Sequence, residues 1–237
     1  MNLDHPLSIV VVAAGSGQRF GGPRPKQYLD LAGHPILFHT LKAFHDHPAI
    51  GAILPVIAPD GEALWQRWLG PLLARLPRVL SPVRGGATRQ ESVWRGLAAL
   101  ALPADAWVAI HDAARPFPGK KLLDRLLEGR KDHVALIPAL PAADTVKSVD
   151  PGSNIILETL DRSRIWLAQT PQLFHHGTIL DLHERARAAG FVATDDASLA
   201  EWGGIAVRVV PGDHRNIKIT HPWDLELANK WLEENQS

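Results

Sequence analysis

Apolar runs and amphipathic segments alternate along the first 140 residues of the chain. Continuous apolar runs, which are typical of buried strands, occupy residues 8–13, 51–57, 78–81, 106–111 and 134–140. Apolar residues at helical spacing predict helices at residues 36–44, 62–69, 88–100 and 120–127. The helix at residues 88–100 starts with the capping-box pattern of Thr88 and Glu91. This alternation predicts a mostly parallel sheet that is covered by helices on both faces.

The alternation stops near Pro141, and a different pattern follows. Residues 145–170 contain short extended pieces around the turn sequence Asp150-Pro151-Gly152. Two strands joined by such a turn predict a hairpin-like arm within residues 141–170, with apolar residues that either project from the domain or pack on it. Beyond the arm, the pattern predicts a helix at residues 176–189, strands at residues 205–210 and 216–219, and a last helix from near Thr220.

Composition limits the class of protein. The chain has 237 residues, of which 46% are hydrophobic and 21% charged, and this favours a single domain over residues 1–237. Lys and Arg total 25, as do Asp and Glu, so the basic excess typical of nucleic-acid binders is missing. No stretch approaches the roughly 20 apolar residues of a membrane span. With no cysteine and no cationic leader, we expect a cytoplasmic protein that binds neither nucleic acid nor membrane.

A glycine-rich, basic stretch, AAGSGQRFGGPRPKQ at residues 13–27, follows the first predicted strand. Glycine lets backbone N–H groups approach an anion closely, so the stretch suggests phosphate binding. The dinucleotide-binding pattern fails because position 20 is Phe20, and the Walker A pattern fails because Pro23 replaces its lysine. Arg19 and Lys26 remain able to converge on one polyanion; the alternative is a surface loop with solvated cations.

A second candidate is HDAARP at residues 111–116, directly after a predicted strand. Ligands of open parallel sheets bind beyond the carboxyl ends of the strands, so we expect Asp112 near the glycine-rich stretch. One carboxylate beside a polyphosphate is the usual minimum for Mg²⁺. Alternatively, Asp112 caps a turn or pairs with Arg115.

Seven motifs in order extend this picture over essentially the whole chain: AAGSGQR…PKQYL, GGATRQESV, HDAARP, ADTVK, LDRSRIWLAQTPQLF, TDDAS and NIKIT. With these motifs the sequence resembles the 2-C-methyl-D-erythritol 4-phosphate cytidylyltransferase family. The resemblance implies a Rossmann-like α/β nucleotidyltransferase fold of GT-A type, with three layers and a protruding β-arm. It also implies transfer of CMP from CTP to 2-C-methyl-D-erythritol 4-phosphate, with release of pyrophosphate, in non-mevalonate isoprenoid synthesis. The expected cofactor is Mg²⁺ or another divalent cation.

The resemblance assigns roles to individual residues. Arg19 and Lys26 would stabilise the transition state, and Arg162 and Lys218 would hold the acceptor phosphate for attack. The expected nucleotide-binding residues are Ala13, Ala14, Gly15, Gly17, Gly86, Ser92 and Asp112, and Asp112 is also the expected metal ligand. The expected acceptor-binding residues are Arg115, Thr145, Arg162, Thr170 and Lys218.

The resemblance further implies a homodimer in which the arm crosses to a second subunit. Thr145 and Arg162 would then serve the neighbour's active site. Ala87 stands where some family members carry an acid, which predicts weaker CTP binding. Asp195 and Asp196 match the acidic motif of the family, although they also suit the cap of the helix ASLAEW.

Two other functions stay open at this stage. The first keeps the chemistry but uses ribitol 5-phosphate as acceptor, as a sister group of cytidylyltransferases does. The second is a non-catalytic, nucleotide-binding regulatory module. The charged residues of the motifs argue against the second function, because a protein that only binds nucleotide has no need of all of them. They are Arg19, Lys26, Asp112, Arg162 and Lys218.

Overall fold

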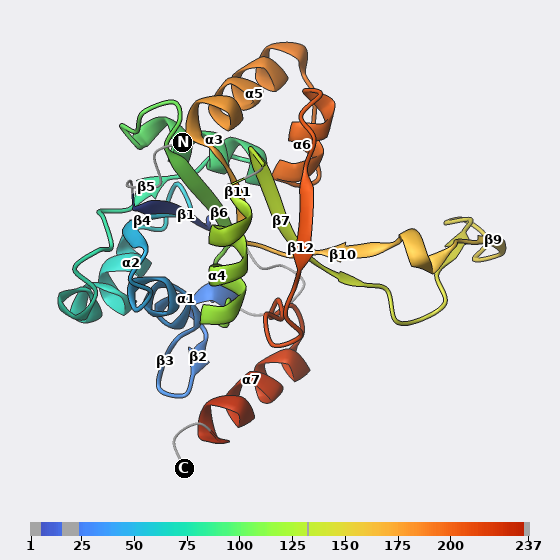
Figure 1. Cartoon of the computed structure of the whole chain (residues 1–237). Helices are drawn as coiled ribbons and strands as arrows, with labels where there is room; N and C mark the ends of the chain where they lie inside the picture. Colours follow the sequence, from blue (N-terminus) through green and yellow to red (C-terminus); the bar gives the residue numbers. More distant parts are fainter. Residues whose placement is uncertain (1–5, 16–23, 132, 235–237) are drawn as a thin grey trace.

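The computed structural model describes residues 6–15, 24–131 and 133–234, and a mixed eight-stranded sheet lies at its centre (Figure 1). The strand order is β10-β7-β11-β6-β1-β4-β5, and β12 pairs with β7. The strands are β1 (Leu7–Ala13), β4 (Ile50–Ile57), β5 (Val83–Arg84), β6 (Trp107–Asp112), β7 (Ala135–Pro141), β10 (Trp166–Ala168), β11 (Gln172–His175) and β12 (Arg208–Pro211). The pairs β1–β4, β1–β6, β4–β5 and β7–β12 are parallel. A small hairpin pairs β2 (Asp30–Leu31) with β3 (His34–Pro35).

Helices cover both faces of this sheet. They are α1 (Ile36–His45), α2 (Glu62–Trp68), α3 (Arg89–Ala99), α4 (Lys120–Gly129), α5 (His176–Ala189), α6 (Asp196–Trp202) and α7 (Pro222–Glu234), with short 3₁₀ turns η2 (Lys26–Tyr28), η3 (Gly70–Arg75) and η4 (Arg162–Arg164). Alternate residues of β1 enter opposite cores: Ile9 packs with residues of α1, α2 and α4, whereas Val10 packs with residues of α3, α5 and α6. The predicted three-layer α/β fold is therefore confirmed. None of the described helices has the length and apolar character needed to cross a membrane.

Three details of the sheet differ from the sequence-based prediction. Residues 78–81 contribute only a single bridge, between Val79 and Ile53, and residues 216–219 form no strand. In the latter segment the Asn216 side chain donates to the carbonyl of Thr170 at 2.8 Å and the Ile219 N–H donates to the carbonyl of Ala114 at 2.8 Å, so separate bonds hold this segment instead of a ladder. The third detail is β11, an unpredicted strand that lies antiparallel between β6 and β7.

The predicted arm is present and projects from the body of the domain (Figure 1). Its strands β8 (Lys147–Val149) and β9 (Ile156–Thr159) pair antiparallel. The Asp150 carboxylate closes the turn by accepting from the backbone N–H groups of Gly152 at 3.1 Å and Ser153 at 2.7 Å. Ile155 and Leu157 are 65% and 66% exposed, so the alternative that these side chains pack on their own domain is wrong.

Candidate active site

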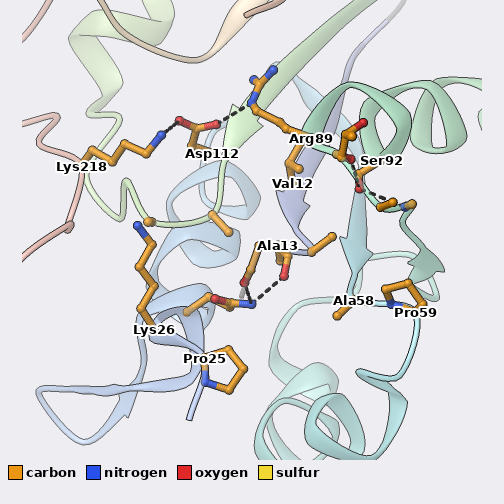
Figure 2. Close-up of a pocket in the computed structure, with 18 of the residues that line it drawn as sticks. Val12, Ala13, Pro25, Lys26, Ala58, Pro59, Arg89, Ser92, Asp112 and Lys218 are labelled. Atoms are coloured by element: carbon orange, nitrogen blue, oxygen red, sulfur yellow. Dashed lines mark hydrogen bonds and ion pairs between the residues drawn. The ribbon is translucent and has the colours of Figure 1, made fainter. Parts of the chain in front are cut away.

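A pocket of about 770 Å³ opens beyond the carboxyl ends of the central parallel strands (Figure 2). Its walls come from the ends of β1 and β6, the loop after β4, the turn before α3, η2, and the segment before α7. This position is where open α/β sheets bind ligands. Of the predicted residues, the structure brings eight to this pocket: Ala13, Ala14, Gly15, Lys26, Gly86, Ser92, Asp112 and Lys218.

Gln27 holds the basic loop against the end of β1. Its side-chain Nε2 donates to the carbonyl of Ala13 at 2.6 Å and to that of Gly15 at 3.1 Å (Figure 2). The side chain is buried, so these bonds are shielded from competing water. They fix η2 on the strand end and thereby place Lys26 at the pocket. Gln27 was not predicted as a site residue, although its position beside Lys26 was a signal.

The turn before α3 forms the opposite wall. The Gly86 N–H donates to Ser92 Oγ at 3.0 Å, and this hydroxyl donates to the Thr88 carbonyl at 2.8 Å. A Cβ at Gly85 would lie 2.7 Å from the Cβ of Ala14, so only glycine permits this close approach to the end of β1. Ser92 therefore shapes the wall in this structure as well as lining it.

The predicted capping box of α3 is half formed. Thr88 accepts from the Glu91 N–H at 3.0 Å, as expected. The Glu91 carboxylate, however, accepts from the N–H of Ala87 at 2.8 Å in place of Thr88, and it pairs with Arg95 at 2.6 Å. The backbone of Ala87 is thus held by Glu91, even though its own side chain has no polar group.

Within the described part of the chain, three cations lie around Asp112 at the end of β6. Lys218 Nζ lies 2.8 Å from Oδ2 and Arg89 Nε lies 3.3 Å from Oδ1 (Figure 2), while Arg115 Nε is 4.0 Å from Oδ2. Burial by itself would raise the pKa of the Asp112 carboxyl, but Arg89 and Lys218 outweigh it and hold that pKa well below its usual range. Asp112 is therefore an anion at neutral pH. The alternative that it pairs with Arg115 is met only at 4.0 Å, and the closer partners of its carboxylate are Lys218 and Arg89.

A buried hydrogen-bond chain fixes the backbone around Asp112. Thr170 Oγ1 accepts from the Asp112 N–H at 3.1 Å and lies 3.0 Å from His111 Nδ1, while His111 Nε2 lies 2.9 Å from the Arg115 carbonyl. Because that carbonyl only accepts, Nε2 carries the proton and the Thr170 hydroxyl donates to Nδ1. Burial lowers the pKa of His111 to about 4, so the ring is neutral at pH 7. Thr170 thus supports Asp112 directly.

The predicted acceptor residues fall into separate places. Lys218 lines the pocket, whereas Arg115 does not line it and donates through Nη1 to the Asn216 carbonyl at 2.7 Å. Thr145 and Arg162 lie exposed on the arm, where Arg162 Nη1 donates to the Ala143 carbonyl at 2.6 Å. Neither arm residue lines the pocket of its own chain. Arg19 and Gly17, the remaining two predictions, lie outside the described residues.

Sequence reasoning did not single out Arg89, which bridges two carboxylates. Arg89 Nη2 lies 2.8 Å from Asp196 Oδ2, in addition to the contact of its Nε with Asp112. Burial lowers the pKa of this guanidinium, but Asp196 and Asp112 raise it more, so Arg89 stays charged. Asp195 caps α6 by accepting from the Ser198 N–H at 2.8 Å, as suggested by the sequence. Asp196 instead points into the domain towards Arg89.

The residues around Asp112 suit one type of metal site. The described residues contain no cluster of three or more His, Cys, Asp or Glu side chains that would enclose a metal ion. Among the described residues, Asp112 Oδ1 accepts one hydrogen bond, from Arg89, and Oδ2 accepts one, from Lys218, so each oxygen has a second lone pair for another partner. Mg²⁺ takes one or two carboxylates and fills its other positions with water and substrate phosphates. Asp112 therefore fits an Mg²⁺ ion that arrives with a nucleotide.

Solved structures share the fold of this chain. A 4-diphosphocytidyl-2C-methyl-D-erythritol synthase from Anaerococcus prevotii superimposes with a TM-score of 0.81 at 31% identity, over 96% of this chain and 98% of that one. A 2-C-methyl-D-erythritol 4-phosphate cytidylyltransferase from Francisella tularensis gives a TM-score of 0.80 at 36% identity, over 94% and 98% of the two chains. The chain thus shares its whole fold with these proteins.

Sequence comparisons agree. A 2-C-methyl-D-erythritol 4-phosphate cytidylyltransferase from Symbiobacterium thermophilum is 41% identical over 98% of this chain and 95% of that protein. The bifunctional enzyme IspD/IspF of Rhizobium etli is 44% identical over 96% of this chain, which spans about half (57%) of that longer protein. The sequence model of the 2-C-methyl-D-erythritol 4-phosphate cytidylyltransferase family matches residues 7–234. The chain therefore belongs to the 2-C-methyl-D-erythritol 4-phosphate cytidylyltransferase family and is a nucleotidyltransferase.

Proposed function

We propose that this chain transfers CMP from CTP to 2-C-methyl-D-erythritol 4-phosphate and releases pyrophosphate. In this reaction an acceptor phosphate oxygen forms a bond to the α-phosphorus, and the bond from that phosphorus to the bridging oxygen of pyrophosphate breaks. The pyrophosphate leaves with the electron pair. The acceptor phosphate is already an anion at neutral pH, so the site needs no general base. The observation that carries the proposal is the meeting of Lys26, Asp112 and Lys218 in one pocket of a family member.

The uncharged part of the pocket suits the nucleoside. The backbone of Ala13, Ala14 and Gly15 lines it on one side, and the Gly86–Ser92 turn lines it on the other. The turn is fixed by the bonds of Ser92 Oγ to Gly86 N–H and Thr88 O. A rigid wall of this kind favours a base of one size, because a larger purine would have to displace the turn. This argument supports a pyrimidine nucleotide, such as CTP, over a purine nucleotide.

The charged part of the pocket suits the phosphates. Negative charge accumulates on the α-phosphoryl oxygens in the transition state, and cations placed in advance stabilise it without reorganisation. Lys26 is held at the pocket by its neighbour Gln27 and would act there together with Arg19. Asp112 would hold a Mg²⁺ ion, which when bound neutralises phosphate charge and orients the nucleotide tail. Lys218 would hold the acceptor phosphate for attack.

The arm supports a homodimer. Ile155, Ile156 and Leu157 are all more than half exposed, and a group of exposed apolar side chains marks an interaction surface. Thr145 and Arg162 lie on the same arm and do not reach the pocket of their own chain. We infer that they complete the acceptor site of a partner subunit. Gel filtration should give a dimer for the wild type and a monomer for Leu157→Asp; a monomeric wild type would contradict the proposal.

A cytoplasmic location is part of the proposal. The chain has no cysteine, which suits a reducing compartment but does not require one. The nucleoside triphosphate and the phosphorylated acceptor are both intracellular metabolites. Microscopy of a fluorescent fusion should show signal throughout the cytoplasm, and signal confined to the envelope would contradict this part.

One assay distinguishes the proposed function from its alternatives. Pyrophosphate release is measured with CTP, UTP, ATP and GTP, each with 2-C-methyl-D-erythritol 4-phosphate or ribitol 5-phosphate and Mg²⁺. We expect turnover with CTP and the methylerythritol acceptor and far less with every other pair. Faster turnover with ribitol 5-phosphate would establish the sister activity. Binding of CTP without any pyrophosphate release would establish the regulatory module.

A further inference from the structure

A series of charged and polar side chains runs from the pocket into the interior of the domain. Arg89 Nε lies 3.3 Å from Asp112 Oδ1, Arg89 Nη2 lies 2.8 Å from Asp196 Oδ2, and His183 Nε2 lies 3.3 Å from Asp196 Oδ1. These residues come from the end of β6, the starts of α3 and α6, and α5. The Asp196 and His183 side chains are each 1% exposed, so water does not screen the inner half of the series.

The two contacts of Arg89 are unequal. Charge-assisted N–H···O bonds ordinarily measure about 2.7–2.9 Å, and the contact of Arg89 with Asp196 lies in this range. The contact with Asp112 is longer, at 3.3 Å. Asp196 is therefore the principal partner of the guanidinium, and Asp112 is the weaker one. The Asp112 carboxylate therefore interacts less strongly with this guanidinium than it would in an isolated Arg–Asp pair, and it remains available to another cation.

Attachment of α6 to the domain does not explain why Asp196 is charged. The Gln172 side chain donates to Asp195 Oδ2 at 2.8 Å and accepts from the Ala197 N–H at 3.0 Å, which ties the start of α6 to β11. Gln90 similarly binds the backbone of the segment between α5 and α6. A well-packed apolar residue would attach α6 equally well without the desolvation cost of a buried carboxylate. The charge of Asp196 therefore points to a role at Arg89.

We propose that Asp196 is a positioning residue that acts through Arg89 to keep the Asp112 carboxylate available to a divalent cation. This inference rests on the proposed function and on its metal site. While Asp196 carries its negative charge, it holds the Arg89 guanidinium, and the Asp112 carboxylate is available to a divalent cation that arrives with the nucleotide. Without the negative charge at position 196, the guanidinium would bind Asp112 more closely and compete with the cation for its carboxylate.

The direct test measures metal binding without turnover. Mn²⁺ is titrated into the full chain with saturating CTP and no acceptor, and free Mn²⁺ is followed by electron paramagnetic resonance. Asp196→Asn keeps the side-chain shape and should raise the Mn²⁺ dissociation constant about tenfold, the size expected for a charge-assisted bond moved from one carboxylate to the other. Asp195→Asn is the matched control, because Asp195 caps the same helix without contacting Arg89, and its Mn²⁺ affinity should equal that of the wild type.

Steady-state kinetics distinguish a weakened metal site from a site that has lost its structure. At saturating Mg²⁺ the turnover of Asp196→Asn should return close to the wild-type value, with an unchanged KM for the acceptor. A site that is merely distorted would not recover with added metal. In an Arg89→Gln background, Asp196→Asn should have no further effect on Mn²⁺ affinity, because the group through which it acts is gone.

Three results would overturn the inference. They are wild-type Mn²⁺ affinity in folded Asp196→Asn, an equal loss of affinity in Asp195→Asn, and a further loss when Asp196→Asn is added to Arg89→Gln. Should Asp196→Asn alone fail to fold, a further loss of Mn²⁺ affinity when it is added to Arg89→Gln would still overturn the inference. A wild-type chain that releases no pyrophosphate contradicts the proposed function instead, so the two failures are distinguishable.

Discussion

The predicted site residues of the pocket and those of the arm lie in different surroundings. In the pocket, the Asp112 side chain is 13% exposed and lies against Lys218 and Arg89, whereas on the arm Thr145 and Arg162 face solvent. Water and salt screen interactions between exposed charges. The charged groups of the pocket therefore interact strongly within a single chain, whereas the exposed charges of the arm do not. Under the proposed function, the nucleotide half of the site would form within each chain, while the acceptor half would need the arm of a partner subunit.

The largest effect is expected from removing a cation of the pocket. Lys26→Ala should lower turnover by about 10²–10³-fold, because it removes a positive charge placed beside the developing phosphoryl charge. The melting temperature should stay close to the wild-type value, since the two bonds of Gln27 that fasten the loop to β1 remain. Lys120→Ala is the control: this exposed lysine pairs with Asp124 on α4 and should leave turnover unchanged. Wild-type turnover in Lys26→Ala would remove Lys26 from the mechanism, and the same test applies to Arg19→Ala.

A smaller effect is expected from a methyl group at the nucleotide wall. A Cβ at Gly15 would meet no atom of the described residues within 4 Å, so Gly15→Ala should fold and melt like the wild type. It should nevertheless weaken CTP binding about tenfold by calorimetry, because the methyl group would occupy space beside the phosphates. Gly152→Ala, in the turn of the arm, is the control and should bind CTP normally. Unchanged CTP affinity in Gly15→Ala would show that this backbone does not approach the nucleotide.

The smallest effect is a partial recovery of activity between two inactive variants. If each site combines the body of one chain with the arm of its partner, a mixed dimer of Lys26→Ala and Arg162→Ala contains one intact site. Random mixing in equal amounts gives about half mixed dimers, so about a quarter of wild-type activity should return. Mixed dimers are verified by two different affinity tags. Absence of recovery in verified mixed dimers would mean that each site is built within one chain.

Much of the fold was predictable because its signals are local. The apolar run of β1 and the helical spacing of α1 and α5 each fix one element from its own residues, and the predicted bounds agree with the structure closely. The turn at Asp150 was predictable for the same reason, because its carboxylate binds the next backbone N–H groups along the chain. β11 was missed because it is short and lies antiparallel between β6 and β7, and its place depends on those distant strands.

The candidate site divides in the same way. Lys26, Gly86, Ser92 and Asp112 belong to compact motifs, so the sequence by itself determined the chemistry: a basic, glycine-rich loop and one carboxylate after a strand. Only the tertiary structure decided which charges meet. Arg89 and Asp196 are 107 residues apart in sequence. Their ion pair is nevertheless 2.8 Å long, as short as the pair between Lys218 and Asp112. Such pairing depends on how helices pack around the sheet, because electrostatic interactions are set by distance and burial, which no single segment of sequence specifies.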